Sequence, residues 1–287
     1  MKISGFSIVR NAIELDFPIV ESIRSILPWC DEVVVNVGCS TDETLAQVRS
    51  IADPKVRIIE SEWDFSRGSA VLRDETARAM RACRHPWGLY VQADEVLHEG
   101  GGPAIVAAIT AVDADPTIEG IAVRYRHIFG NPDREAVSRK WYRREVRGVR
   151  LGAQFAVHPF RDAQGFRVGP SDRPIRARLA DAEMFHYGYV RSAAALRGRA
   201  GIDRALYPDR AFDADDPANL WWFPGIRPFH GTHPSVAADW LARRADDPDR
   251  RVSPPRFKLE HLRFYASDLI ERMTGWRPFE FRNYRLG

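Results

Sequence analysis

Two adjacent carboxylates, Asp94 and Glu95, directly follow an apolar run at residues 88–92 that is typical of a buried strand. Ionised carboxylates at such a place lose hydration free energy unless a cation or hydrogen-bond donors compensate them. Mg²⁺ and Mn²⁺ bind few protein oxygens and complete their coordination with substrate phosphates. The pair therefore predicts a metal site. The alternative is an aspartate that caps a helix, followed by a glutamate in the first turn.

The elements that must position these carboxylates alternate between two periodicities over the first hundred residues. Apolar runs predict strands, and residues that share one face every three or four positions predict helices. The strands are expected at 3–9, 32–37, 56–60 and 88–92, and the helices at 19–27, 45–51 and 69–83. This order predicts an α/β fold with a mostly parallel sheet flanked by helices. Because ligands of such sheets bind at the carboxyl ends of the strands, functional residues should follow each strand.

Polar residues stand at the ends of the first two predicted strands. Arg10 and Asn11 follow the first strand, and Asn36 lies near the end of the second. Ser40 and Asp42 come next, at the start of a helix, where free N–H groups and side-chain oxygens can hold a base or a ribose. Simple helix capping is the alternative for Ser40.

The rest of the chain divides into two further sections. Residues 101–191 begin with a helix at 103–112 and continue with strand-like segments, of which 118–126 and 140–150 are the clearest. Residues 192–287 are rich in Trp, Pro and Arg and contain one further helical pattern at 259–273. We expect the first two sections, 1–100 and 101–191, to share one core and the third to form a C-terminal helical and aromatic extension.

The segment at 140–150 concentrates basic residues around one carboxylate. As a strand it would place Trp141, Arg143, Glu145 and Arg147 on one face, because side chains alternate with a period of two. An aromatic ring beside a carboxylate and two guanidinium groups could form the floor for an acceptor sugar or an anionic lipid-linked acceptor. A solvated edge strand, protected by its charges, is the alternative.

Within this segment, Glu145 is the best candidate for a general base. A transfer to an acceptor hydroxyl needs a carboxylate within hydrogen-bond reach of that hydroxyl. Neighbouring arginines would lower its pKa and also suit a purely structural ion pair. Asp181 and Glu183 are the rival candidates for this role.

The stretches 7–11, 33–44 and 92–95 together resemble the nucleotide-sugar-binding half of glycosyltransferase family 2, which has the GT-A fold. The resemblance implies that Asp94, with Glu95, holds Mn²⁺ or Mg²⁺ on the donor diphosphate. It further implies that Asn11, Asn36 and Asp42 hold the base and the ribose. Two positions depart from the family pattern, because Gln92 replaces the first Asp of the DxD motif and Asn36 replaces an Asp. Both amides can still bond to a base or ribose but carry no charge.

Two further residues enter through the same resemblance. Arg73 falls where the family carries a basic residue over the nucleotide, and Arg67 is a second candidate; the alternative for Arg73 is a solvated helix residue paired with a neighbouring carboxylate. His186 belongs to a stretch at 185–191 that resembles the family's HxGxxR motif, whose His completes the metal shell. A hydrogen-bonded core histidine is the alternative.

The resemblance implies a metal-dependent glycosyltransferase that moves a sugar from a nucleoside diphosphate sugar to an acceptor hydroxyl with inversion. Residues 1–100 would bind the donor, 101–191 the carbohydrate or lipid-linked acceptor, and 192–287 would form a lid or a membrane or partner contact. Surface polysaccharide or lipopolysaccharide synthesis would suit such an enzyme. The alternatives are a non-catalytic nucleotide-sugar-binding protein and a nucleotidyltransferase, although residues 7–13 lack the glycines of a phosphate loop.

Composition excludes several other classes. The 42 basic and 39 acidic residues leave a net charge of +3, too small for a dedicated nucleic-acid binder. No apolar stretch reaches the roughly 20 residues that span a bilayer, and the N-terminus does not resemble a signal peptide. We therefore expect a cytoplasmic protein, with residues 261–284 able to rest on the inner face of a membrane.

His230 and His233 have HxxH spacing but lack a third ligand nearby, which favours a structural role.

Overall fold

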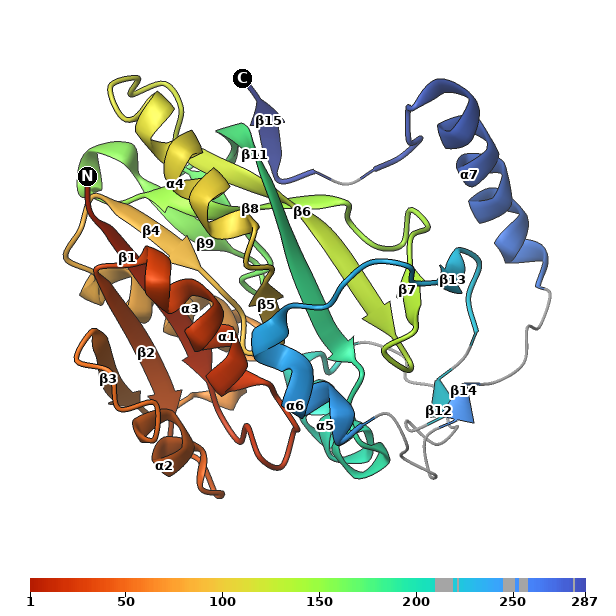
Figure 1. The fold of residues 1–287 in the computed structure, drawn as a ribbon, viewed down its shortest axis with the longest axis horizontal. Helices are drawn as coiled ribbons and strands as arrows, with labels where there is room; N and C mark the ends of the chain where they lie inside the picture. The colour runs from red at the N-terminus through yellow and green to blue at the C-terminus, as the bar shows by residue number, and fades with distance from the viewer. Residues whose placement is uncertain (210–218, 221, 245–250, 253–257, 281) are drawn as a thin grey trace.

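The structure is a computed structural model of the 287-residue chain, and it describes residues 1–209, 219–220, 222–244, 251–252, 258–280 and 282–287. A large twisted sheet occupies the centre of the molecule, and helices cover both of its faces (Figure 1). The sheet has two parts. The first is built by alternating strands and helices, and the second mainly by antiparallel strands.

The first part follows the predicted alternation. In chain order its elements are β1 (Ile3–Val9), α1 (Ile19–Ile26), β2 (Glu32–Gly38), α2 (Thr44–Arg49), β3 (Val56–Ser61), α3 (Ala70–Ala82) and β4 (Trp87–Tyr90). The strands pair in parallel in the order β3-β2-β1-β4. Every residue of β1, β2 and β4 is buried, as expected for parallel strands covered on both faces. Each element lies close to its predicted position.

The second part extends the sheet beyond β4. Its elements are β5 (Glu95–Leu97), α4 (Gly101–Val112), β6 (Gly120–Phe129), β7 (Arg134–Ala136), β8 (Arg144–Arg150), β9 (Val157–Phe160), β10 (Gly165–Val168) and β11 (Arg173–Tyr189). Strand β8 lies antiparallel between β4 and β6, and β11 then pairs with β6 in parallel. Four of the six pairings from β3 to β11 are parallel. The predicted α/β class with a mostly parallel sheet is therefore confirmed.

The strand predicted at 140–150 is shorter than expected. It begins only at Arg144, because the chain turns just before it and the Trp141 N–H donates to the carbonyl of Ser138. Trp141 and Arg143 therefore do not share a strand face with Glu145, which corrects the predicted acceptor floor. Strand β8 is also a central strand, so the alternative of a solvated edge strand is wrong as well.

Two apolar cores lie on opposite faces of the sheet. On one face, Ile23 of α1 and Ile105 of α4 pack against strand residues such as Val35. On the other face, Phe6 and Tyr90 stack with ring centroids 5.1 Å apart, beneath α3. Neighbouring residues of one strand contribute to different cores because successive side chains point to opposite faces.

The remaining chain wraps around the sheet. Its elements are α5 (Ala193–Leu206), β12 (Asn219–Leu220), β13 (Ile226–Pro228), α6 (Ala238–Ala242), β14 (Arg251–Val252), α7 (Leu262–Thr274) and β15 (Tyr284–Leu286). Five short 3₁₀ turns complete the described elements: η1 (Leu27–Trp29), η2 (Phe65–Arg67), η3 (Ala153–Phe155), η4 (Ser235–Ala237) and η5 (Leu259–His261). Strand β13 pairs with β7, and β15 pairs with β11. The division into sections 1–100, 101–191 and 192–287 stays a prediction.

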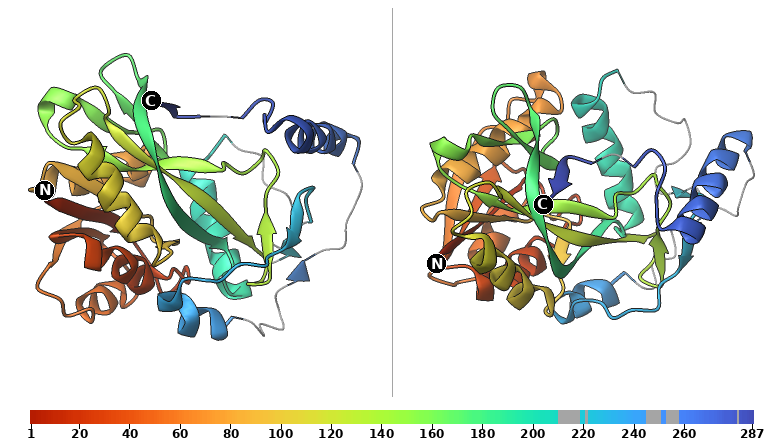
Figure 2. Two further views of the ribbon diagram at one scale, coloured as in Figure 1. Left: turned by 45° about the horizontal axis from the view of Figure 1, so that its top comes forward. Right: turned by 90° about the horizontal axis from the view of Figure 1, so that it is seen from above.

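Helix α7 lies at the edge of the molecule (Figures 1 and 2). Its predicted position at 259–273 agrees with η5 followed by α7. Within the described ranges, no helix is both long and apolar enough to cross a membrane.

The segment after α7 is fastened by a buried carboxylate. Glu280 accepts two hydrogen bonds of 2.8 Å from the Arg143 guanidinium and two more from Arg282. Burial alone would raise the pKa of Glu280, but the bonds from Arg143 and Arg282 outweigh it and lower the pKa to about 2. The ionised form is therefore the one that the folded state stabilises.

We predict that Glu280→Gln lowers the free energy of unfolding at neutral pH by about 1–3 kcal/mol, because it removes charge-assisted hydrogen bonds. A group whose pKa is lowered by folding stabilises above its ordinary value, here 4.5, and loses that effect as the pH falls towards 2. The difference between wild type and variant in urea unfolding should therefore shrink over that interval. Glu62→Gln, an exposed control, should change little at any pH.

Candidate active site

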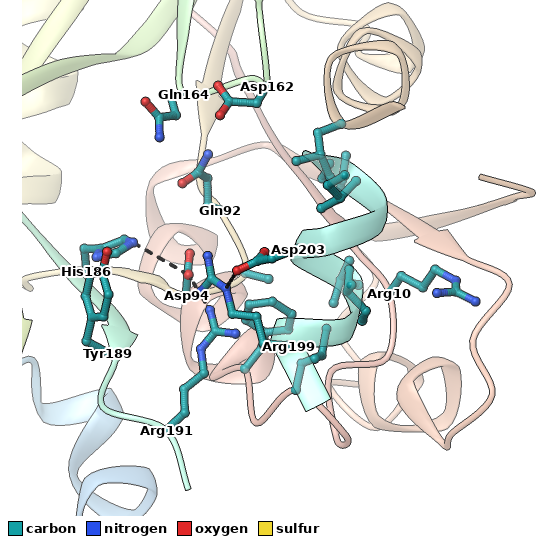
Figure 3. A pocket seen from close by; sticks show the side chains of 18 of the residues that line it. Arg10, Gln92, Asp94, Asp162, Gln164, His186, Tyr189, Arg191, Arg199 and Asp203 are labelled. Atoms are coloured by element: carbon teal, nitrogen blue, oxygen red, sulfur yellow. Dashed lines mark hydrogen bonds and ion pairs between the residues drawn. The ribbon is translucent and has the colours of Figure 1, made fainter. Parts of the chain in front are cut away.

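A cavity of about 350 Å³ opens at the carboxyl ends of β1 and β4. The end of β11 and helix α5 form its other walls, together with the turn between β9 and β10 (Figure 3). Of the residues predicted for a site, five line this cavity: Arg10, Gln92, Asp94, Trp141 and His186. The cavity thus lies where a parallel sheet is expected to bind its ligand.

Asp94 and His186 meet in this cavity because two short segments of sheet pair with each other. Asp94 follows β4 and precedes β5, and β5 pairs antiparallel with β11 so that His186 lies opposite Glu95. The His186 Nε2 atom lies 3.6 Å from Asp94 Oδ2. Gly188 leaves room for this approach, because a Cβ atom there would lie 2.5 Å from the His186 ring and 3.1 Å from Asp94 Oδ2.

The protonation states of the two side chains suit a divalent cation. Burial alone would raise the pKa of Asp94, but His186 and Arg191 outweigh it and hold the pKa below its usual value. Burial lowers the pKa of His186, despite the opposing effect of Asp94. An ionised carboxylate and a neutral imidazole are both ligands for Mn²⁺ or Mg²⁺. The described residues contain no cluster of three or more such ligands, so the protein offers two and a substrate would supply others.

Two arginines from the end of β11 and from α5 converge beside Asp94 (Figure 3). The Arg191 Nη2 atom donates to Asp94 Oδ2 at 2.7 Å, and its guanidinium lies 4.1 Å from the centroid of the Phe17 ring. Burial, together with Arg199, lowers the pKa of Arg191 to about 9, which still leaves the group charged at neutral pH. Arg199 pairs with Asp203 at 3.3 Å. The two guanidinium groups thus lie in the cavity wall together with two carboxylates, Asp94 and Asp203.

Glu95 does not face this cavity, which corrects its predicted role as a metal ligand. The side chain is fully buried and forms a two-pronged ion pair with Arg147, at 2.7 and 2.9 Å. The hydroxyl of Tyr125 and the backbone N–H of Gln92 also donate to its two oxygens. Asp94 lies in the turn before β5, which the bond from the Glu95 N–H to the Gln92 carbonyl closes, and Glu95 is the first residue of the strand. Asp94 and Glu95 therefore face different surroundings.

Glu145 also lies outside the cavity, which corrects its candidacy as the base. It is only 3 % exposed and accepts hydrogen bonds from the Asn283 side chain and the Val146 backbone. Its rivals lie elsewhere too. Asp181 is on the surface and pairs with Arg124, and Glu183 pairs with Arg126.

The residues predicted to hold the base and the ribose connect the strand ends to one another. Asn11, at φ 52°, bonds to the backbone and the hydroxyl of Thr41, and Asp42 accepts from the backbone N–H groups of Ile13 and Glu14. Asn36 is fully buried. It donates to Glu75, accepts from the Ser61 hydroxyl, and so lies behind the cavity wall. These three residues shape the loops after β1 and β2, and none of them belongs to the lining of the cavity. Their contacts with a base or ribose stay a prediction.

Of the basic residues predicted for the donor site, one lines the cavity and the others do not. Arg10 lines the cavity, donates to the Cys39 carbonyl and lies over the Phe65 ring. Arg73 lines a neighbouring pocket and pairs with Asp74, which agrees with its alternative as a helix residue paired with a neighbouring carboxylate. Arg67 pairs with the same carboxylate. His233 bonds to the Tyr187 hydroxyl and the Pro132 carbonyl, so it has the structural role that its spacing favoured.

Several cavity residues were not identified from the sequence. They are Lys140, Tyr142, Asp162, Gln164, Tyr189, Arg191, Arg199, Asp203 and Tyr207. Arg191 is the final residue of the HxGxxR stretch, so that motif contained a signal for it. Asp162 lies in the turn between β9 and β10, where it accepts a hydrogen bond of 2.8 Å from the Tyr207 hydroxyl. No periodic pattern marks such a position.

Comparison with known proteins identifies the family. The model described as glycosyl transferase family 2 matches residues 18–167, slightly more than half of the chain. The chain belongs to glycosyltransferase family 2. This confirms the resemblance found in the sequence and the assignment to the glycosyltransferases. No curated protein matches this chain.

Solved structures from the glycosyltransferases show weaker similarity to this family 2 chain. TarS from S. aureus (residues 1–349) is 21 % identical with a TM-score of 0.36, and the match covers 45 % of this chain and 36 % of TarS. Glucosyl-3-phosphoglycerate synthase from Mycobacterium tuberculosis, solved with Mn²⁺, UDP and glucosyl-3-phosphoglycerate, is 18 % identical with a TM-score of 0.31. That match covers 45 % of each chain. The chain thus spans less than half of either solved chain.

We predict that Gly188→Ala in this family 2 protein lowers the free energy of unfolding by about 1–3 kcal/mol, because the new methyl group overlaps the His186 ring. In the double variant with His186→Ala the ring is absent, so the two effects should not add. Chemical denaturation of the four proteins of the cycle measures this coupling. Gly201→Ala is the matched control. No described atom lies within 4 Å of its Cβ position in α5, so this change should be neutral or stabilising.

Proposed function

We propose that the protein transfers a sugar from a nucleoside diphosphate sugar to an acceptor hydroxyl. The observation that carries the proposal is the convergence of Asp94, His186 and Arg191 in one cavity at the carboxyl ends of β1, β4 and β11. These groups suit the chemistry of a departing diphosphate, which gains negative charge as the bond to the sugar breaks. Membership of glycosyltransferase family 2 supports the same reaction class.

The leaving diphosphate would be stabilised by both protein and metal. Asp94 and His186 would hold Mn²⁺ or Mg²⁺, which supplies Lewis-acid stabilisation of the phosphate oxygens. Arg191 and Arg199 provide positive charge within the same cavity. Arg191, which lies beside Asp94, would add positive charge next to the metal and the phosphates.

The nucleoside would occupy the apolar end of the cavity. Phe65, Trp63 and Leu72 line that wall, and Arg10 stacks over the ring of Phe65. Planar bases stack favourably on aromatic rings and guanidinium groups. Gly38 permits this arrangement, because a Cβ atom at that position would lie 2.7 Å from Trp63 Nε1.

The acceptor would be activated by Asp162. Transfer with inversion, which we adopt from the family resemblance, needs one carboxylate near the acceptor hydroxyl. Three carboxylates belong to the described cavity wall: Asp94, Asp162 and Asp203. Asp94 faces His186 and Arg191, and Asp203 pairs with Arg199. Asp162 and Asp94 line the same cavity of about 350 Å³, and Gln92 lies between them in Figure 3. The acceptor would be a carbohydrate or lipid-linked carbohydrate.

A non-catalytic nucleotide-sugar-binding protein is the second candidate. Arg191 already neutralises Asp94, and Gln92 supplies no charge where the family motif starts with Asp. Such a protein would bind a nucleoside diphosphate without a metal and would not release it from a sugar donor.

We predict that UDP or GDP with Mn²⁺ raises the free energy of unfolding by about 2.7 kcal/mol when the nucleotide is at about one hundred times its Kd. Asp94→Asn should abolish this effect, because it removes the charged ligand of the metal. Thermal unfolding with and without EDTA measures both. Asp115→Asn, a change at an exposed carboxylate outside the cavity, serves as the control. Stabilisation that persists in EDTA would favour the second candidate, and no stabilisation by any nucleoside diphosphate would contradict the proposal.

We predict that Asp162→Asn lowers turnover by about 10²–10⁴-fold, the usual contribution of a general base. Nucleotide binding should remain close to that of the wild type, because Asp162 does not contact Asp94 or His186. Release of nucleoside diphosphate from a panel of sugar donors measures turnover. Glu145→Gln is the informative comparison, since Glu145 is outside the cavity and its amide can keep the bond with Asn283. Full turnover in Asp162→Asn would exclude it as the base.

A further inference from the structure

One side of α7, which we call its outer face, is apolar and exposed. Leu262, Leu269 and Met273 lie on this side by their helical spacing, and they are 53 %, 59 % and 77 % exposed. Trp276 and Phe279, just beyond the helix, are also exposed. Monomeric soluble proteins rarely expose a continuous apolar patch without using it for a contact.

The opposite side fastens α7 to the rest of the protein. Phe264 packs edge-on against Phe223, with ring centroids 4.7 Å apart. Glu271 forms ion pairs with Arg143 at 2.9 Å and with Arg277 at 2.5 Å. These contacts determine which side of the helix points away from the protein, and the ribbon views place α7 at the edge of the molecule (Figures 1 and 2).

A second cavity, of about 340 Å³, lies between α7 and the strands β6 and β8. We call it the arginine pocket, because seven arginines and four carboxylates line it. Asp181 and Glu280, outside the lining, pair with Arg124 and Arg143, which leaves an excess of one positive charge among these described groups. Arg272 of α7 belongs to its wall and lies beside Met273 and one turn from Leu269 on the outer face. The basic cavity and the apolar stripe are therefore neighbours around the same helix.

The strand side of the arginine pocket brings like charges together. Arg124 of β6 lies directly opposite Arg144 of β8, and Arg126 projects from the same face two residues along β6. Like charges in such cross-strand pairs repel. Arg124 pairs with Asp181, whose side chain is 89 % exposed, and Arg144 makes no ion pair with any carboxylate in the described part of the chain. An anion bound here would relieve the repulsion.

We propose that α7 and the arginine pocket dock the protein on the surface of a bilayer that contains anionic lipids. The outer face of α7 enters the boundary between headgroups and acyl chains, and the arginine pocket binds a lipid phosphate. A helix with an apolar face, aromatic residues and adjacent arginines has the chemistry of an interfacial anchor. Guanidinium groups bind phosphate oxygens in pairs, which suits a headgroup better than a neutral surface.

A second copy of the chain fits this surface less well. Most homodimers are two-fold symmetric and place the same patch of both subunits in contact. A symmetric contact through the outer face of α7 would bring Arg272 and the arginine pocket of each copy towards those of the other. An anionic bilayer has the opposite charge and is complementary to the same patch.

The test is co-sedimentation of the whole protein with vesicles of phosphatidylcholine, with and without phosphatidylglycerol, at low and high salt. Wild type should bind the vesicles that contain phosphatidylglycerol, and high salt should weaken that binding. Arg124→Ala/Arg144→Ala should weaken it roughly 25-fold, at roughly fivefold for each basic residue near an anionic surface. Leu269→Glu/Met273→Glu should also lose binding. Arg24→Ala/Arg81→Ala, which removes two exposed arginines from α1 and α3, is the matched control and should bind as wild type does.

Circular dichroism and nucleotide binding of each variant show that the fold and the donor site are intact, so the outcome does not depend on the proposed function. Equal binding to both kinds of vesicle, or unchanged binding by either α7 or pocket variants, would overturn the proposal. So would a wild-type dimer in light scattering that Leu269→Glu/Met273→Glu converts to monomer, because a second copy would then be the occupant. Loss of vesicle binding in both variant pairs, with the control unaffected, would support it.

Discussion

The buried ion pair between Glu95 and Arg147 holds the centre of this protein together. Glu95 begins β5, Arg147 lies in β8, and the Tyr125 hydroxyl adds a bond from β6, so one carboxylate joins three strands. Removing one partner of such a pair leaves an uncompensated buried charge, which typically costs about 3–5 kcal/mol. The ion pair fixes β5 against β8 and β6, and β5 also pairs with the end of β11, so the residue before β5 is held from both sides. That residue is Asp94, and its approach to His186 depends on the pair behind it.

Much of the fold could be predicted from the sequence because its first hundred residues obey simple periodicities. Fully buried parallel strands read as continuous apolar runs, and β1 was found at the residues expected for it. The strand at 140–150 was placed too early, because nothing in its composition marks the turn at Trp141. The hydrophobic pattern of the sequence locates a strand well when every residue of the strand must be apolar to be buried. It locates a strand less well when the strand contains charged residues, because these occur in several environments.

The candidate site was predicted at Asp94 and His186, for which strand position and the family motif agreed, and less well elsewhere. Asn11, Asn36 and Asp42 are polar and follow strands, yet their partners are other loop residues. A sequence does not say whether an amide at a strand end will bond to a ligand or to a neighbouring loop. Glu95 and Glu145 show the same limit for carboxylates. Each is buried and bonds to another buried side chain of the protein, Glu95 to Arg147 and Glu145 to Asn283. Asp162 and Arg199 come from a turn and a helix that only the tertiary structure brings to the cavity.

Strand β15 has a consequence for how this molecule reaches its native state. It pairs with β11 through Ile175 and Tyr284, more than one hundred residues apart in the chain. Closing so long a loop carries an entropic penalty before the contact becomes favourable, and non-local pairings of this kind slow folding. The strand that carries His186 thus acquires its last neighbour only through a long-range closure. Until then an unpaired edge of β11 is exposed, where another chain could add, so the final three-residue strand also protects the folding protein from aggregation.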